Sequence, residues 1–297
     1  MSDADLLPSI PKALPDLSVA IQPTRRGPLG VLDSGVGGLS VLVHLCRRLP
    51  AESMLYFADQ AHIPYGPRSP EQLREFTAEI TSFLLRGGAK TIVVACNTAT
   101  AAALDYLRQQ FPTIPFVGME PAVKPAAQTT RSGKVGVLAT PSTLNSHRYA
   151  GLMSRYAAGI QVYEDPCNGL VQLIEAGAID APETRVLLHH VVDPMLAAGV
   201  DTLVLGCTHY PFVRRLLAEV AGPDVAIIDP APAVARHTQF VLQQHQLAVA
   251  PDGPQGSRRC FTSGSPQQLE AMAALMLDGD CPAEHVHWRN NRLLGAP

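Results

Sequence analysis

The chain has 297 residues, of which 46% are hydrophobic and 16% are charged, and its net charge is −3. This composition is typical of a compact globular protein and excludes disorder over most of the chain. The sequence also lacks an apolar run of the roughly 18 residues that a membrane helix needs. A slightly acidic chain with 5% aromatic residues offers no basic stripe for a nucleic acid, so neither nucleic acid nor membrane is expected as a main partner.

The first 27 residues are predicted to be a flexible extension. They contain four prolines and begin with acidic residues, without the charged and apolar regions of a secretion signal. The six cysteines (46, 96, 167, 207, 260 and 281) form no CxxC pair, in a chain too long to need disulfide staples. These features predict a protein of a reducing, cytoplasmic compartment.

From Pro28 onward, short continuous apolar runs alternate with amphipathic stretches. Continuous runs are typical of strands that are covered on both faces, so the pattern predicts an α/β fold with mostly parallel sheets. The strands are expected at 29–33, 54–59, 91–96, 115–119, 134–139, 161–165, 202–207 and 225–229. The clearest helices are expected at 39–49, 69–88 and 181–199.

The order of these signals repeats along the chain. Residues 29–35 resemble 135–141, and residues 91–102 resemble 202–213, where each strand ends in a cysteine and two hydrogen-bonding residues. We infer two similar halves that join near Glu120 and Pro121. The alternative is that any two α/β units look alike, but the equivalent placement of the two cysteines favours a true repeat.

Cys96 and Cys207 lie at the carboxyl ends of predicted strands, where open α/β sheets bind ligands. The helix that follows each strand would point its N-terminus at the thiol. We therefore expect partly exposed thiols whose pKa is lowered by the helix dipole. A single cysteine is more often a small core residue, and that interpretation is kept for Cys46, Cys260 and Cys281.

Several chemistries use cysteine in this way. A hydrolase would use Cys207 with His209 and leave Cys96 without a role, and a zinc site lacks the expected ligand spacing. A redox couple requires two neighbouring sulfurs, which the sequence neither shows nor excludes. Two thiols on opposite faces of one carbon would make a racemase, and two similar halves fit its mirror-image substrates.

Such a racemase needs helper groups. Asp33, at the end of the first strand and just before the turn that Ser34 begins, would assist Cys96. His209, tuned by Glu175, would assist Cys207. Asp33 also fits a helix N-cap. Taken alone, the pattern around Glu175 favours a solvated helix face.

Other polar residues at the strand ends are ambiguous between helix capping and binding of a substrate carboxylate. They are Asn97, Thr98 and Thr208. The turn Gly35-x-Gly37 starts like a dinucleotide-binding fingerprint, but Ser40 stands where the third glycine belongs. A dehydrogenase is therefore a weak alternative, and the lysines offer no anchor for pyridoxal phosphate.

Taken together, these motifs closely resemble the cofactor-independent, two-cysteine glutamate racemases of the aspartate/glutamate racemase family. The resemblance spans roughly residues 28 to 265. The segments that carry it are DSGVGGLSV (33–41), DQAHIPYG (59–66), ACNTATA (95–101), CNGLVQLIEAG (167–177), GCTHYPF (206–212), IIDPA (227–231) and FTSG (261–264).

The resemblance implies that Cys96 removes the Cα proton of D-glutamate and that Cys207 removes that of L-glutamate. It implies Asp33 as the partner of Cys96, with His209 and Glu175 assisting Cys207, and neither cofactor nor metal. The implied substrate-binding residues are Asp33, Ser34, Tyr65, Gly66, Asn97, Thr98, Thr140, Thr208 and His209.

The resemblance further implies two α/β domains facing each other across a central cleft. The first would comprise 28–121 with 230–297, and the second 122–229. It implies a homodimer, a role in peptidoglycan synthesis and, from the N-terminal extension, activation by a peptidoglycan precursor. An aspartate racemase of the same superfamily and a two-lobed protein that binds an acidic ligand remain alternatives, and 247–259 is expected to be a loop.

Overall fold

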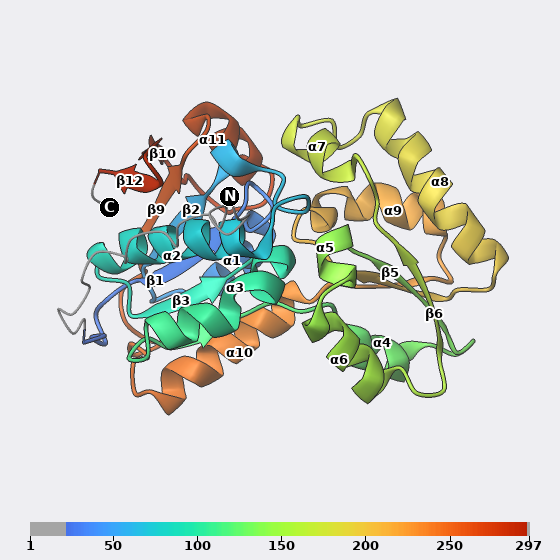
Figure 1. Cartoon of the computed structure of the whole chain (residues 1–297), viewed down its shortest axis with the longest axis horizontal. Coiled ribbons are helices and arrows are strands. Elements are labelled where there is room, and N and C mark those ends of the chain that lie inside the picture. Colours follow the sequence, from blue (N-terminus) through green and yellow to red (C-terminus); the bar gives the residue numbers. More distant parts are fainter. Residues whose placement is uncertain (1–21, 296–297) are drawn as a thin grey trace, which may run out of the picture.

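Two parallel β-sheets organise the chain in the computed structural model, which describes residues 22–295 (Figure 1). The first sheet has the order β10-β9-β2-β1-β3-β4 and the second β6-β5-β7-β8. The first contains β1 (Leu29–Asp33), β2 (Met54–Ala58), β3 (Thr91–Val94), β4 (Phe116–Val117), β9 (Arg258–Thr262) and β10 (Ala283–His285). The second contains β5 (Lys134–Leu138), β6 (Gln161–Asp165), β7 (Thr202–Leu205) and β8 (Ala226–Ile228).

The two sheets share one strand order. In the first sheet β2-β1-β3-β4 follows the same pattern as β6-β5-β7-β8 in the second, and all these neighbours are parallel. The predicted class, two similar α/β units built on parallel sheets, is confirmed. The chain leaves the first sheet after β4 and returns to it at β9.

Helices cover both faces of each sheet. Around the first lie α1 (Leu39–Arg48), α2 (Pro70–Arg86), α3 (Asn97–Gln110), α10 (Ala231–Gln244) and α11 (Pro266–Ala274). Around the second lie α4 (Val123–Thr129), α5 (Pro141–Leu144), α6 (His147–Tyr156), α7 (Leu170–Glu175), α8 (Pro182–Ala197) and α9 (Arg214–Ala221). Short 3₁₀ turns span Gln60–His62 and Tyr210–Val213.

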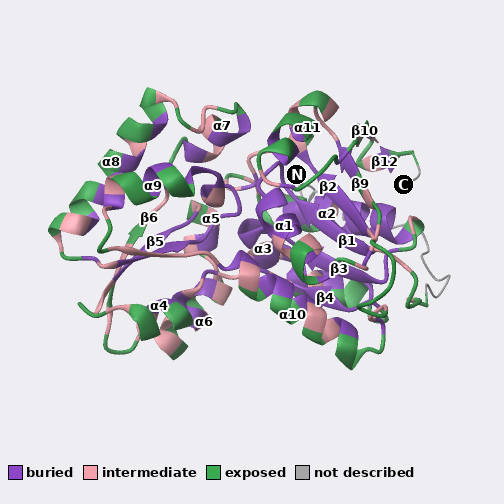
Figure 2. Cartoon of the chain, turned by 180° about the vertical axis from the view of Figure 1, so that it is seen from behind, coloured by how far each residue is buried: buried purple, intermediate pink, exposed green. Residues whose placement is uncertain are grey.

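The continuous apolar runs follow from this two-sided cover. Successive side chains of a strand point to opposite faces, so Val31 of β1 packs in the cluster with α1 and α10, whereas Leu32 packs with α2 and α3. All five residues of β1 are buried. Figure 2 shows β1, β2 and β3 as a buried centre, with exposed residues on the outer sides of the helices, whereas β6 at the edge of the second sheet is half-buried or exposed.

Local signals set the helix starts. Before α2, Ser69 accepts the amide of Gln72, and the Gln72 side chain accepts the amide of Ser69, with Pro70 at the first helical position. This capping box begins the helix within one residue of the predicted start. The predicted loop at 247–259 lacks helix or strand up to Ser257, and β9 takes its last two residues.

Some features of the chain differ from expectation. Strands β9 and β10 and the hairpin of β11 (His287–Arg289) and β12 (Arg292–Leu294) were not among the predicted strands. Cys260 and Cys281, both buried, form a disulfide, so the expectation of a chain without disulfide staples is wrong at this pair. Of the predicted extension, residues 1–21 lie outside the described residues, while the carbonyl of Arg25 accepts the Lys90 ammonium at 2.7 Å.

None of the helices described in residues 22–295 is long and apolar enough to cross a membrane.

Candidate active site

The two cysteines singled out in the sequence follow equivalent strands of the two sheets. Cys96 lies two residues after β3 and Cys207 two residues after β7, and β3 and β7 hold the same position in their sheets. Only 5% of Cys96 and 6% of Cys207 is exposed. The expectation of partly exposed thiols is therefore wrong, because the two units close over this region.

Asp33, at the end of β1, connects the two halves. It is fully buried, and its Oδ2 accepts the amides of Gly38 at 2.8 Å and Gly35 at 3.2 Å. Its Oδ1 accepts the hydroxyl of Thr208 at 3.3 Å. Burial raises the pKa of Asp33, although the charge of His209 and the two amides oppose this. The carboxylate binds the turn ahead of α1, since the helix itself begins after Gly38.

Cys96 is the N-cap of α3, and its sulfur accepts the amide of Ala99 at 3.5 Å. Its thiol lies 3.9 Å from the hydroxyl of Ser34. Burial and the neighbouring charge of Asp33 raise the pKa of Cys96 well above its usual value, despite the Ala99 amide. The prediction of a lowered pKa is wrong for this thiol, because desolvation outweighs the helix N-terminus.

On the other side of the cleft, Cys207, His209 and Glu175 form a chain of contacts. His209 Nδ1 lies 3.7 Å from Cys207 Sγ, and Nε2 lies 2.6 Å from Glu175 Oε1. Burial alone would lower the pKa of His209, but its hydrogen bonds to Cys207 and Glu175 and their charges raise that pKa well above the usual range. Burial opposes ionisation of Glu175, yet the hydrogen bond and charge of His209 lower its pKa. The pair is therefore an imidazolium beside a carboxylate.

Glu175 is buried, so the solvated helix face favoured by the local pattern is wrong. The first unit holds this carboxylate: the amide of Val36 donates to Oε1 at 2.8 Å, and Gln60 donates to Oε2 at 3.1 Å. The Gln268 side chain also donates to the Glu175 carbonyl. Sequence reasoning missed both glutamines, although Gln60 lies within the motif DQAHIPYG.

The remaining predicted residues line the space between the units. The Thr98 and Thr140 hydroxyls, one from each unit, lie 2.8 Å apart. Both polar atoms of the Asn97 side-chain amide are buried and have no hydrogen-bond partner within residues 22–295, which leaves them available to a ligand. Tyr65 is instead held by a buried carboxylate of its own unit, Asp59.

A cavity of about 390 Å³ opens beside these residues. Gly66 and Pro64 line it from the first unit, and Thr140, Cys167 and Tyr210 line it from the second. Cys167 and Tyr210 were not predicted as site residues, although both stand in quoted motifs. The Tyr210 hydroxyl is buried and has no hydrogen-bond partner among the described residues.

The glycine turn between β1 and α1 allows the two units to approach each other closely. A Cβ on Gly37 would lie 2.5 Å from His209 Nδ1 and 2.6 Å from Thr208 Oγ1. A Cβ on Gly35 would overlap the carboxylate of Glu175. The glycines that suggested a dinucleotide fingerprint therefore let backbone of the first unit touch side chains of the second.

Gly37→Ala should open this contact. The added methyl group forces His209 and Thr208 away, so Cys96 and Cys207 should react several-fold faster with a thiol reagent in the folded protein. The rate of thiol modification, followed by absorbance and assigned by peptide mapping, measures this. Gly151→Ala is a matched control, because its Cβ would meet only the far end of Arg155 at 4.0 Å. Equal labelling rates in both variants would contradict the account.

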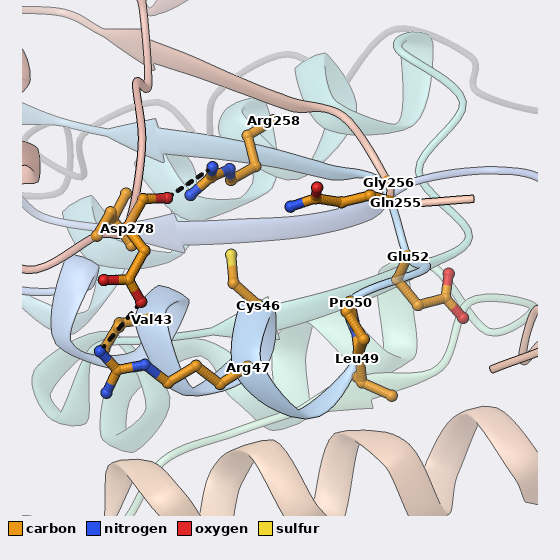
Figure 3. A pocket seen from close by; sticks show the side chains of 11 residues that line it. Val43, Cys46, Arg47, Leu49, Pro50, Glu52, Gln255, Gly256, Arg258 and Asp278 are labelled. Atoms are coloured by element: carbon orange, nitrogen blue, oxygen red, sulfur yellow. Dashed lines mark hydrogen bonds and ion pairs between the residues drawn. The ribbon is translucent and has the colours of Figure 1, made fainter. Parts of the chain in front are cut away.

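Another hollow, of about 120 Å³, lies beside Cys46 near the C-terminal end of α1 (Figure 3). Its charged groups already have partners: Arg47 pairs with Asp278 at 3.3 Å, and Glu52 pairs with the buried Lys90 at 2.5 Å. Arg258 donates to the Asp278 carbonyl at 2.9 Å. It shares no lining residue with the cleft. Across residues 22–295, no three His, Cys, Asp or Glu side chains come together as metal ligands.

Comparison with known proteins identifies the family of the chain. Residues 31–238 match the family model described as Asp/Glu/Hydantoin racemase. A glutamate racemase of Pseudomonas paraeruginosa is 53% identical over 252 residues, covering 85% of this chain and 94% of the relative.

Solved structures of glutamate racemases show the same fold. That of an isoform from Bacillus anthracis matches with a TM-score of 0.80 at 33% identity, over 90% of this chain and 99% of that one. The Escherichia coli enzyme, solved with L-glutamate and the activator UDP-MurNAc-Ala, matches with a TM-score of 0.77 at 31% identity. The match covers 90% of this chain and 100% of that one.

Proposed function

Since the chain belongs to the Asp/Glu/hydantoin racemase family, it is an isomerase that interconverts the enantiomers of glutamate, and we propose that Cys96 and Cys207 move the proton. The observation that carries this proposal is the pair of buried thiols at equivalent strand ends of two facing units. Each thiol has its own acid–base neighbour.

In the direction from D- to L-glutamate, the Cys96 thiolate removes the Cα proton and the Cys207 thiol delivers its proton to the opposite face. In the reverse direction the two sulfurs exchange roles. Asp33, beside Cys96, and the His209–Glu175 pair, beside Cys207, return the sulfurs to the required protonation states. Burial and the charge of Asp33 raise the pKa of Cys96, which favours its thiol form, the form that delivers a proton in the direction from L- to D-glutamate.

The polar residues around the thiols support a dicarboxylic amino acid as substrate. The unpartnered amide of Asn97 and the paired hydroxyls of Thr98 and Thr140 supply donors from both units. We propose that these residues bind glutamate together with Asp33, Ser34, Tyr65, Gly66, Thr208 and His209.

Deuterium labelling tests the two-thiol route. When pure L-glutamate reacts in deuterated water, the D product should carry deuterium at Cα, while early residual L-glutamate stays mostly unlabelled. Proton NMR with chiral separation measures both. Label appearing equally in the two enantiomers would indicate a single base instead. Glutamate binding without loss of optical rotation would favour a ligand-binding protein, and aspartate as the better substrate would favour the related aspartate racemases.

Activation by a peptidoglycan precursor is a further part of the proposal. The Escherichia coli relative was solved with the activator UDP-MurNAc-Ala, and the match covers 100% of that relative's chain. Turnover of this enzyme should rise when UDP-MurNAc-Ala is added at constant glutamate. Initial rates by polarimetry measure the effect, and equal rates with and without the compound would contradict it.

The cellular setting follows from the same premise. We propose that the D-glutamate supplies peptidoglycan synthesis in the cytoplasm. We retain the predicted domains, 28–121 with 230–297 and 122–229, which the membership of β9 in the first sheet supports. The homodimer stays a prediction that analytical ultracentrifugation tests.

A further inference from the structure

Another buried carboxylate, Asp59, lies directly after β2 and has no part in the proton transfer above. It is fully buried. Four side chains bond to its two oxygens: Tyr65 OH at 2.7 Å, His62 Nδ1 at 2.9 Å, Ser263 Oγ at 2.8 Å and Trp288 Nε1 at 2.8 Å. An ionised carboxylate has about four acceptor positions, so these contacts saturate it. Because such a group only accepts, Nδ1 of His62 carries the hydrogen.

The four donors come from three separate parts of the chain. His62 and Tyr65 belong to the loop of residues 60–66, which also carries Gly66. Ser263 follows β9, and its hydroxyl oxygen also accepts the amide of Ala61 at 3.0 Å. Trp288 lies on β11 of the C-terminal hairpin, beyond the residues that the family model matches. Asp59 thus joins the loop 60–66 to two C-terminal segments.

Aromatic packing fixes the geometry of these donors. The His62 ring stacks on Phe76 of α2 with centroids 3.8 Å apart. Trp288 approaches the His62 ring edge-on at 4.9 Å and Phe76 at 5.9 Å. The hairpin has its own anchor, since Arg292 pairs with the buried Glu79 at 3.0 Å. Trp288 is therefore held by its ring contacts with His62 and Phe76 and by the ion pair that anchors its hairpin.

The same loop reaches both halves of the active site. Tyr65 and Gly66 stand among the proposed substrate-binding residues, and Gly66 lines the cavity beside Thr140. At its other end, Gln60 donates to Glu175 at 3.1 Å and accepts the hydroxyl of Thr262 at 2.7 Å. Displacement of this loop would disturb substrate contacts first and the His209–Glu175 pair second.

We propose that Asp59 is a positioning residue for the racemase: together with Trp288 it fixes the loop 60–66 in the conformation that binds glutamate. The inference rests on the proposed function, because it assigns the loop to the substrate. It gives the C-terminal hairpin a role in catalysis, although no part of the hairpin enters the cleft contacts described above.

Two variants and one control test this role. Trp288→Phe keeps an aromatic ring against His62 and Phe76 but removes the N–H donor. Asp59→Asn replaces one acceptor oxygen by an amide N–H₂ group, which is a donor and faces at least one of the present donors. In Trp288→Phe we expect KM for D-glutamate to rise about 3- to 10-fold, because hydrogen bonds to a charged group are strong, while kcat stays within about 2-fold of the wild type. In Asp59→Asn the rise in KM should be larger. Arg289→Gln, exposed on the same hairpin, should match the wild type.

A contact-level readout is independent of activity. Trp288 is the only tryptophan of the chain, so its emission reports on this contact, and Asp59→Asn should shift the emission maximum and increase quenching by acrylamide. Unchanged emission in folded Asp59→Asn would overturn the proposal. So would a wild-type KM in both variants with only a lower Tm, or an equal KM change in Arg289→Gln. A wild-type enzyme without racemase activity would instead overturn the proposed function, and the emission test would still stand.

Discussion

Replacing Cys96 or Cys207 by alanine should slow interconversion of the glutamate enantiomers by about 10²- to 10⁴-fold, the contribution typical of a positioned acid or base. Each direction needs one thiolate to remove a proton and one thiol to deliver another, so neither variant keeps a working direction. Because the equilibrium constant between enantiomers is one, kcat/KM must fall equally in both directions. Circular dichroism of glutamate measures each rate.

Proton exchange at Cα distinguishes the two cysteines. Cys207→Ala retains Cys96, so in deuterated water it should exchange the Cα proton of D-glutamate without inversion. Cys96→Ala should exchange only the proton of L-glutamate. Proton NMR follows both reactions. Exchange of the opposite enantiomers would reverse the assignment, and normal racemisation by either variant would refute the two-thiol mechanism.

Cys46 offers a matched control for loss of a thiol. It is half-buried on α1, with its sulfur 3.7 Å from Met54 Sδ, and it borders the separate hollow of Figure 3. Cys46→Ala should therefore keep kcat/KM within about 2-fold of the wild type, because a substitution away from the proposed active site has little effect on the reaction. Its Tm shows how much of any effect comes from lost packing.

Glu175→Gln should have the next largest effect, a fall in kcat of about 10²-fold with a changed pH profile. The carboxylate raises the pKa of His209 through its hydrogen bond and its charge, whereas burial lowers that pKa. Removing the carboxylate leaves Cys207 as the only one of these two partners that opposes burial, so the pKa of His209 falls. The imidazolium beside Cys207 is then lost at a lower pH than in the wild type.

Two measurements check this sign. The alkaline limb of kcat against pH should move to lower pH in Glu175→Gln, and histidine carbon NMR should show His209 titrating at lower pH. Glu183→Gln, on the exposed first turn of α8, is the control and should leave both unchanged. An unshifted His209 titration in Glu175→Gln would show that the carboxylate does not hold the imidazolium.

The strand pattern of the core was predictable because parallel strands covered on both faces need continuous apolar runs. Those runs also set where each strand ends, and so placed Cys96 and Cys207 at equivalent positions. The short strands β9 and β10 were not predicted, since both sequences carry charged or polar residues; of the two, only β10 lies at the edge of the sheet. The Cys260–Cys281 disulfide was not predicted either, because spacing along the chain does not reveal which cysteines meet.

The state of the site residues was harder to predict. A strand end before a helix suggests an exposed thiol with a lowered pKa. Cys96 is instead buried in the core cluster of its own unit, and Asp33 of the same unit adds its charge, so the pKa of Cys96 rises. Glu175 reads as a solvated residue because its own helix is short and its partners, Val36 and Gln60, lie more than 100 positions away. Local sequence holds no information on such partners.

The sequence by itself determined the class of fold, its internal repeat and the two cysteines, because these follow from periodicity and residue type within short segments. The resemblance of its motifs to a known family added glutamate as the substrate. Only the tertiary structure decided which groups are buried together: glycines that let the units touch, the His209–Glu175 pair and the contacts of Asp59 with Trp288. Burial and long-range hydrogen bonds set those properties, and both depend on segments that meet only after folding.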